Sequence, residues 1–114
     1  MSLKTSSRKV DGVTIVDLSG RIILGEPTTA LRETLAALVS QGQKDIILNL
    51  AEVSYIDSSG LGALVSGFTT LSGQQGRLKL INLTKKVQDL LQITKLLTVF
   101  EVYSDEAAAL QSFR

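Results

Sequence analysis

The run from residue 45 to 50, Asp-Ile-Ile-Leu-Asn-Leu, constrains the fold more than any other part of this chain. It is short and almost continuously apolar, which is typical of a central strand buried inside a domain. Such a strand needs helices packed over the sheet that contains it. The run therefore indicates a covered sheet.

Further runs of β-branched and apolar residues predict the other strands. Residues 13–18 read as a strand that Ser19-Gly20 closes, and a preceding strand would form a hairpin turned at Asp11-Gly12. The remaining predicted strands cover residues 4–10, 78–83 and 98–103.

Helical spacing appears between these runs. The apolar residues from Leu31 to Val39 follow the i, i+4, i+7, i+8 spacing of an amphipathic helix, with Pro27 in its first turn and residues 41–43 at its end. Further helices are predicted over residues 59–71, from Thr84 through Leu91, and from Asp105 through Phe113. Alternating strands and helices predict an α/β fold, with a mixed, mainly parallel sheet of four to five strands and about four helices, in one domain over residues 1–114.

Composition excludes many classes of function. The chain has no cysteine and no histidine, so it has no disulfides, no Ser-His-Asp or Cys-His arrangement, and no zinc site built on those ligands. Twelve Lys plus Arg against 11 Asp plus Glu give a net charge of +1, which offers no basis for binding nucleic acid or an anionic membrane. No glycine-rich phosphate loop is present, and we expect no cofactor and no metal.

The chain also lacks the apolar segments that would direct it into or across a membrane. No stretch resembles a signal peptide, and none approaches the roughly 18 consecutive apolar residues of a membrane span. The expected location is the cytoplasm.

Residues 55–62, Tyr-Ile-Asp-Ser-Ser-Gly-Leu-Gly, lie where a buried strand leads into a helix. Asp57, Ser58 and Ser59 can each accept a hydrogen bond from the free N–H groups of the first helical turn. For an arbitrary tetrapeptide of this kind, a plain N-cap is the simpler interpretation.

The helix that this segment opens has two unlike faces. Leu61, Leu64, Val65, Phe68 and Leu71 share one face, whereas Ser59, Gly62, Ala63, Ser66 and Thr70 share the other. No charged residue occurs between Asp57 and Arg77, and each of the three glycines costs up to about 1 kcal/mol relative to alanine. We expect the small-residue face to be an exposed recognition surface. The alternative is a helix buried on both sides within its own domain.

This order of elements, with Asp57-Ser58-Ser59-Gly60-Leu61-Gly62 at a helix start, resembles a STAS domain of the bacterial anti-sigma factor antagonist type. The resemblance covers essentially the whole chain and includes Leu18-Ser19-Gly20-Arg21 and the 80–83 strand. It departs from the family at residues 21–25, where an acidic residue is often found and this chain reaches Glu26 only later. The residues expected to contact a partner are Asp57, Ser58, Ser59, Gly60, Gly62, Ala63 and Ser66.

The resemblance implies a regulatory, non-enzymatic role. In this family the serine directly after the aspartate, here Ser58, is phosphorylated by the anti-sigma factor, a GHKL-type ATP-dependent serine kinase, while the neighbouring serine, here Ser59, is not the usual target. The unmodified antagonist binds the anti-sigma factor and frees the sigma factor; phosphorylation ends that binding, and a phosphatase resets it.

Two other interpretations remain open from the sequence. The chain could be a different kind of STAS module, a stressosome-type scaffold or the accessory subunit of a lipid-transport complex, that docks through the same helix face. It could also be a serine hydrolase with Ser58 as the nucleophile, in which case a lysine such as Lys79 or Lys85 would have to serve as the base.

Overall fold

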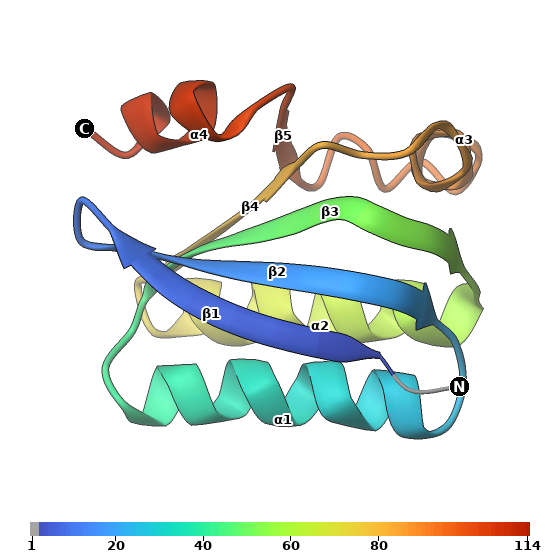
Figure 1. The fold of residues 1–114 in the computed structure, drawn as a ribbon, viewed down its shortest axis with the longest axis horizontal. Helices are drawn as coiled ribbons and strands as arrows, with labels where there is room; N and C mark the ends of the chain where they lie inside the picture. Colours follow the sequence, from blue (N-terminus) through green and yellow to red (C-terminus); the bar gives the residue numbers. More distant parts are fainter. Residues whose placement is uncertain (1–2) are drawn as a thin grey trace.

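Five strands form one mixed sheet in the computed structural model, which describes residues 3–114 (Figure 1). Their order across the sheet is the order of the chain: β1 (Lys4–Val10), β2 (Val13–Ile22), β3 (Asp45–Ile56), β4 (Arg77–Ile81) and β5 (Glu101–Tyr103). β1 pairs with β2 in the antiparallel sense, and all other pairs are parallel. The predicted mixed, mainly parallel sheet is confirmed.

Four helices connect the strands: α1 (Glu26–Ser40), α2 (Ser58–Gly73), α3 (Lys85–Ile93) and α4 (Glu106–Ser112). α1 and α2 lie side by side below the sheet in Figure 1, and α3 and α4 lie above it. Because β2 and β3 are parallel, both α1 and α2 begin at the edge of the sheet where these strands end. The predicted α/β fold class is thus correct.

Neighbouring residues of the central strands enter opposite halves of the core. Leu48 of β3 packs into the large cluster with α1 and α2, whereas the adjacent Ile47 packs into a smaller cluster with Ala109 of α4. Both residues are 0% exposed, as is Ile46. The prediction of a buried strand over residues 45–50 is confirmed, and its physical reason is that helices cover both faces.

Four predicted strand boundaries are wrong. The strand predicted over residues 78–83 ends at Ile81. β2 does not close at Ser19-Gly20 but continues to Ile22, because its ladder with β3 resumes after register shifts next to Ser19 and Gly20. β3 extends to Ile56. The last strand is shorter than predicted, since Thr98 and Val99 belong to a turn, Phe100 is a bend, and only Glu101–Tyr103 pair with β4.

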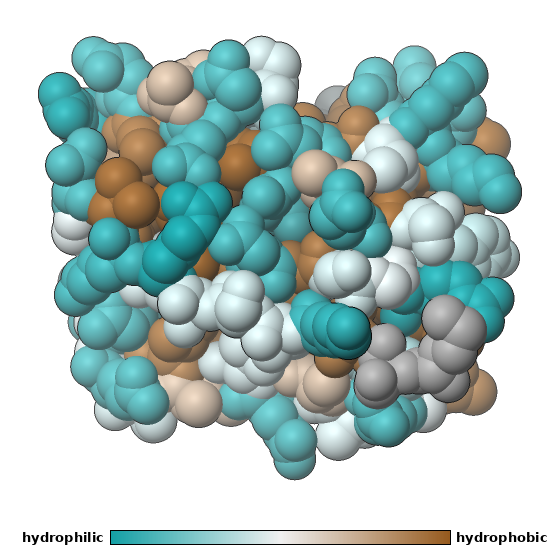
Figure 2. All heavy atoms as spheres, in the orientation of Figure 1, coloured by the Kyte–Doolittle hydropathy of each residue, from teal (hydrophilic) through white to brown (hydrophobic). Residues whose placement is uncertain are grey.

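The predicted hairpin is confirmed, and its first strand forms an edge of the sheet. Asp11 and Gly12 have φ values of 52° and 79°, the left-handed backbone that a tight two-residue hairpin turn requires. Arg8 on β1 donates to Asp17 on β2 at 2.8 Å. Figure 2 shows that this side of the molecule is mostly hydrophilic, with hydrophobic residues in separate patches, as suits an edge strand that does not aggregate.

None of the helices within residues 3–114 combines the length and the apolar character needed to cross a bilayer. Residues 1 and 2 of the predicted 1–114 domain lie outside the described residues.

Gly60 and Gly62 provide a matched test of this packing. A Cβ at Gly60 would collide with the carbonyl oxygen of Ile22 and lie 2.6 Å from Ile56 Cγ1, whereas a Cβ at Gly62 would meet nothing closer than an Arg32 nitrogen at 3.9 Å. We expect Gly60→Ala to lower the free energy of unfolding by about 2–4 kcal/mol. Gly62→Ala should raise it by up to about 1 kcal/mol, because alanine favours helix.

Urea unfolding of the two variants measures both values. Equal stability of the two alanine variants would contradict the close approach of α2 to the end of β2.

Candidate functional site

Asp57 fixes the point where β3 leads into α2. Its Oδ1 accepts a hydrogen bond from the backbone N–H of Gly60 at 2.8 Å, as the N-cap of the helix. Its Oδ2 accepts from the N–H of Leu24 at 3.0 Å, and its own N–H donates to the carbonyl of Ile22 at 3.2 Å. One residue therefore ties the loop after β2 to the first turn of α2.

These bonds also keep Asp57 ionised. The N–H groups of Gly60 and then Leu24 stabilise the carboxylate and lower the pKa of Asp57 below its ordinary value of 3.8, against the opposing effect of partial burial. A charged carboxylate next to the N-terminus of α2 also interacts favourably with the helix dipole.

Ser58 is the first residue of α2, and its side chain is exposed. Its hydroxyl makes no hydrogen bond to any residue that the structure describes. The prediction that Asp57, Ser58 and Ser59 all cap the helix is correct for Asp57 alone. The reason is that the Asp57 backbone is extended, with φ −103° and ψ −175°, which turns its side chain back over the first turn, whereas Ser58 and Ser59 lie within the helix.

The small-residue face of α2 is only partly exposed. Gly62 is exposed, and Ser59 and Ser66 are half-buried. Gly60 is buried, however, and Ala63 is 0% exposed. The expectation of an exposed face is therefore wrong for Ala63. Gly60, which was expected to contact a partner but was not assigned to this face, is also not free to do so directly.

The reason lies in the packing around α2. The end of β2 covers Gly60, and α1 lies alongside the next turns. Gly67 lets Leu35 of α1 approach so closely that a Cβ at Gly67 would stand 2.6 Å from Leu35 Cδ1. Some of the small residues of α2 therefore serve packing within the domain, whereas Gly62 of the small-residue face remains open.

Exposed apolar side chains near the start of α2 were not predicted from the sequence. Leu24, which Asp57 holds through its N–H, is 75% exposed. Tyr55 and Ile93 are 46% and 77% exposed and line one groove with Ile56, between the end of β3 and α3. Only the fold shows that these side chains are exposed and that Tyr55 and Ile93 share a groove, since no local pattern marks an apolar residue as exposed.

The two lysines considered as catalytic bases are engaged elsewhere. Lys79 is buried, donates to Ser112 Oγ at 2.8 Å and pairs with Glu101 at 3.1 Å. Lys85 pairs with Asp89 at 3.1 Å. Neither is hydrogen-bonded to Ser58, so the arrangement that a serine hydrolase needs is not formed by these lysines. Across residues 3–114, no three acidic side chains are grouped so that they could hold a metal ion.

The sequence is similar to known regulatory proteins of bacteria. The sequence model of the STAS domain matches residues 4–109. An anti-sigma-B factor antagonist of Bacillus subtilis is 36% identical over 97 residues, covering 84% of this chain and 86% of that protein.

Solved structures show the same fold. A putative anti-sigma factor antagonist from Thermotoga maritima superposes with a TM-score of 0.88 at 24% identity, over 95% of this chain and 92% of the other. The Bacillus cell fate determinant SpoIIAA in its phosphorylated form superposes with a TM-score of 0.74 at 22% identity, over 97% and 100% of the two chains.

The geometry of Asp57 predicts a pH-dependent contribution to stability. We expect Asp57→Ala to lower the free energy of unfolding at neutral pH by about 1–2 kcal/mol, because the cap of α2 and the bond from Leu24 are both lost. Asp57→Asn should cost less, since one amide oxygen can still accept from Gly60.

Because folding lowers the pKa of Asp57, its ionisation stabilises the fold above the ordinary value of 3.8, and this contribution is lost as the pH falls through the lowered pKa. The difference between wild type and Asp57→Asn, measured by urea unfolding from about pH 6 down to about pH 2, should therefore shrink in acid. A difference that stays constant over this range would contradict the ionised cap.

Proposed function

The chain belongs to the STAS domain family, and from this membership we propose that it acts as an anti-sigma factor antagonist switched at Ser58. In its unmodified state it binds an anti-sigma factor that is also a GHKL-type serine kinase, and the sigma factor is released. Phosphorylation of Ser58 by that kinase ends the binding, and a phosphatase restores it. Because sigma factors act with RNA polymerase, this role belongs in the cytoplasm.

The observation that carries the proposal is that Asp57 and Ser58, although adjacent, have different roles in the fold. Asp57 makes the hydrogen bonds that hold the start of α2, while the Ser58 hydroxyl is exposed and makes none to the described residues. A kinase can therefore reach this oxygen, and its modification removes no contact that the fold uses.

In the free chain, the electrostatic effects of phosphorylating Ser58 nearly cancel. A phosphoserine adds a charge of about −1.5 to −2 and three acceptor oxygens. At the N-terminus of a helix this charge is favoured by about 0.3–1 kcal/mol, while the neighbouring carboxylate of Asp57 opposes it by a similarly modest, salt-screened amount. The two effects are of the same size, so the fold should persist.

In a complex the balance is different. A dianion enclosed between two proteins without a partner charge costs several kcal/mol, and each 1.4 kcal/mol weakens binding about tenfold. One modification can thus abolish docking without unfolding the domain.

The proposed docking surface surrounds Ser58. It contains the open part of the small-residue face, namely Asp57, Ser59, Gly62 and Ser66. Gly60 and Ala63 support it from beneath. The exposed Leu24, Tyr55 and Ile93 nearby add the apolar area that protein interfaces use.

The modification site is tested by a labelling experiment. We expect the cognate anti-sigma factor and radiolabelled ATP to label wild type and Ser59→Ala equally, and to leave Ser58→Ala at background. Labelling of Ser58→Ala at the wild-type level would remove Ser58 as the switch.

The electrostatic switch is tested with Ser58→Asp. This variant should keep the circular dichroism spectrum and thermal midpoint of wild type, and lose at least about tenfold in affinity for the anti-sigma factor by calorimetry. Ser7→Asp is the matched control, since it places the same charge on an exposed serine of β1. Wild-type affinity of Ser58→Asp, or equal weakening of both variants, would count against the mechanism.

A further inference from the structure

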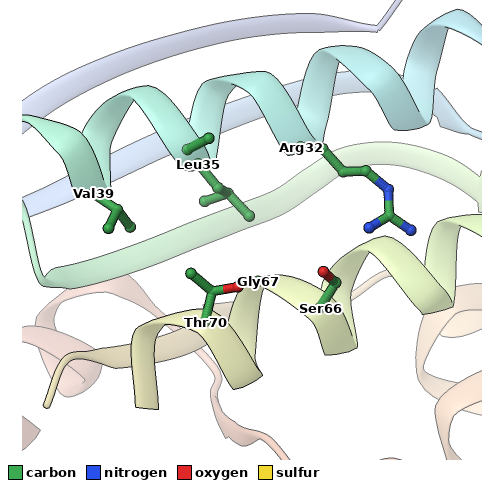
Figure 3. A pocket seen from close by; sticks show the side chains of 7 residues that line it. Arg32, Leu35, Val39, Ser66, Gly67 and Thr70 are labelled. Atoms are coloured by element: carbon green, nitrogen blue, oxygen red, sulfur yellow. The ribbon is translucent and has the colours of Figure 1, made fainter. Parts of the chain in front are cut away.

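A groove runs between the outward-facing sides of α1 and α2 (Figure 3). Its volume is about 220 Å³. It is lined by Arg32, Leu35, Ala36 and Val39 of α1 and by Ser66, Gly67 and Thr70 of α2. The groove remains open because small residues line it: Ala36 on one wall, and Ser66 and Gly67 on the other.

The walls are apolar along most of the groove, with a cation at one end. Leu35, Ala36 and Val39 supply the apolar wall, and Arg32 is the charged member of the lining. In Figure 3 the guanidinium of Arg32 reaches from α1 toward α2 on the N-terminal side of Ser66. One of its nitrogens lies 3.9 Å from the position that a Cβ on Gly62 would take.

Arg32 is exposed and makes neither a hydrogen bond nor an ion pair with the described part of the chain. α2 offers it no carboxylate, since no acidic residue occurs between Asp57 and Arg77. The planar guanidinium is well suited to hold a carboxylate through two parallel hydrogen bonds. The charge that complements the groove is therefore negative.

The size of the groove decides between kinds of occupant. Small-molecule and cofactor sites usually measure about 300–1,000 Å³, which is more than this groove provides. At roughly 30 Å³ per water molecule, 220 Å³ corresponds to about seven waters, enough for one large apolar side chain. The groove also continues onto Gly62 and Ser66, which belong to the proposed docking surface.

We propose that the anti-sigma factor places an apolar side chain in the groove between α1 and α2 and pairs a neighbouring carboxylate with Arg32. This inference rests on the proposed function and extends the docking surface from α2 onto α1. The apolar side chain covers Ala36 and Val39 above Leu35, which is already buried, and the ion pair sets the register of the partner along the helices.

Ala36 and Ala37 provide a matched pair of variants. Both are exposed on α1, but Ala36 lines the groove and Ala37 is turned about 100° away from it around the helix. We expect Ala36→Trp to fill the groove and weaken binding of the cognate anti-sigma factor at least about tenfold, whereas Ala37→Trp stays within about twofold of wild type. Thermal unfolding of both variants checks that the fold is retained.

Arg32→Gln tests the carboxylate. It should weaken binding by about three- to tenfold and reduce the salt dependence of the affinity, because an ion pair is screened by salt. Arg32→Lys should recover part of the loss. Arg114→Gln, which removes an exposed arginine elsewhere, should bind as wild type does.

The outcomes separate this inference from the proposed function. If wild type binds but Ala36→Trp and Arg32→Gln bind equally well, the groove is not part of the interface and the inference is wrong. It is also wrong if Arg32→Gln weakens binding with unchanged salt dependence. If wild type itself does not bind, the proposed function fails and the inference falls with it.

Discussion

The hydrogen bonds of Asp57 determine the geometry on which the rest of this site depends. The side chain holds Gly60 in the first turn of α2 and Leu24 in the loop after β2, while the backbone N–H bonds to Ile22 at the end of that strand. Strand end, loop and helix start are thereby fixed to one another. Because Asp57 makes these bonds, Ser58 can present its hydroxyl to solvent without being needed to hold the helix start.

α2 meets two requirements, and both of them call for small residues. A helix that packs closely against a neighbour needs small residues, and so does a helix that another protein approaches closely. Here Gly67 serves the first requirement beside α1, and Gly62 and Ser66 remain at least partly open for the second. No charged residue lies between Asp57 and Arg77. This suits both close packing within the domain and close approach by a partner, since a long charged side chain would interfere with either contact.

The sequence was sufficient to predict the fold where one pattern decided the local structure. The apolar run 45–50, the turn at Asp11-Gly12, the cap at Asp57 and the helix starts at Thr84 and Asp105 were all predicted and are found. The extent of β2 was not predictable, because the ladder passes through Ser19 and Gly20 at register shifts that only pairing with β3 stabilises.

Within the site, the sequence could not predict which side chains are buried, because burial depends on tertiary packing. A helical wheel groups Ala63 with Gly62, but only the folded chain shows that Ala63 is buried in the core and Gly62 is exposed. The same holds for Leu24, whose N–H bonds to Asp57, and for Tyr55 and Ile93, which line one groove, since the sequence does not mark any of the three as exposed.

The central claim is that charge on Ser58 prevents docking while the domain stays folded. It is tested most directly by amide NMR spectra of the isotope-labelled chain with phosphoserine installed at position 58 during translation, recorded alone and with the anti-sigma factor. We expect shift changes confined to the start of α2 and the adjoining loop, and no line broadening when the partner is added. Shift changes throughout the sheet, or broadening equal to that of the unmodified chain, would contradict it.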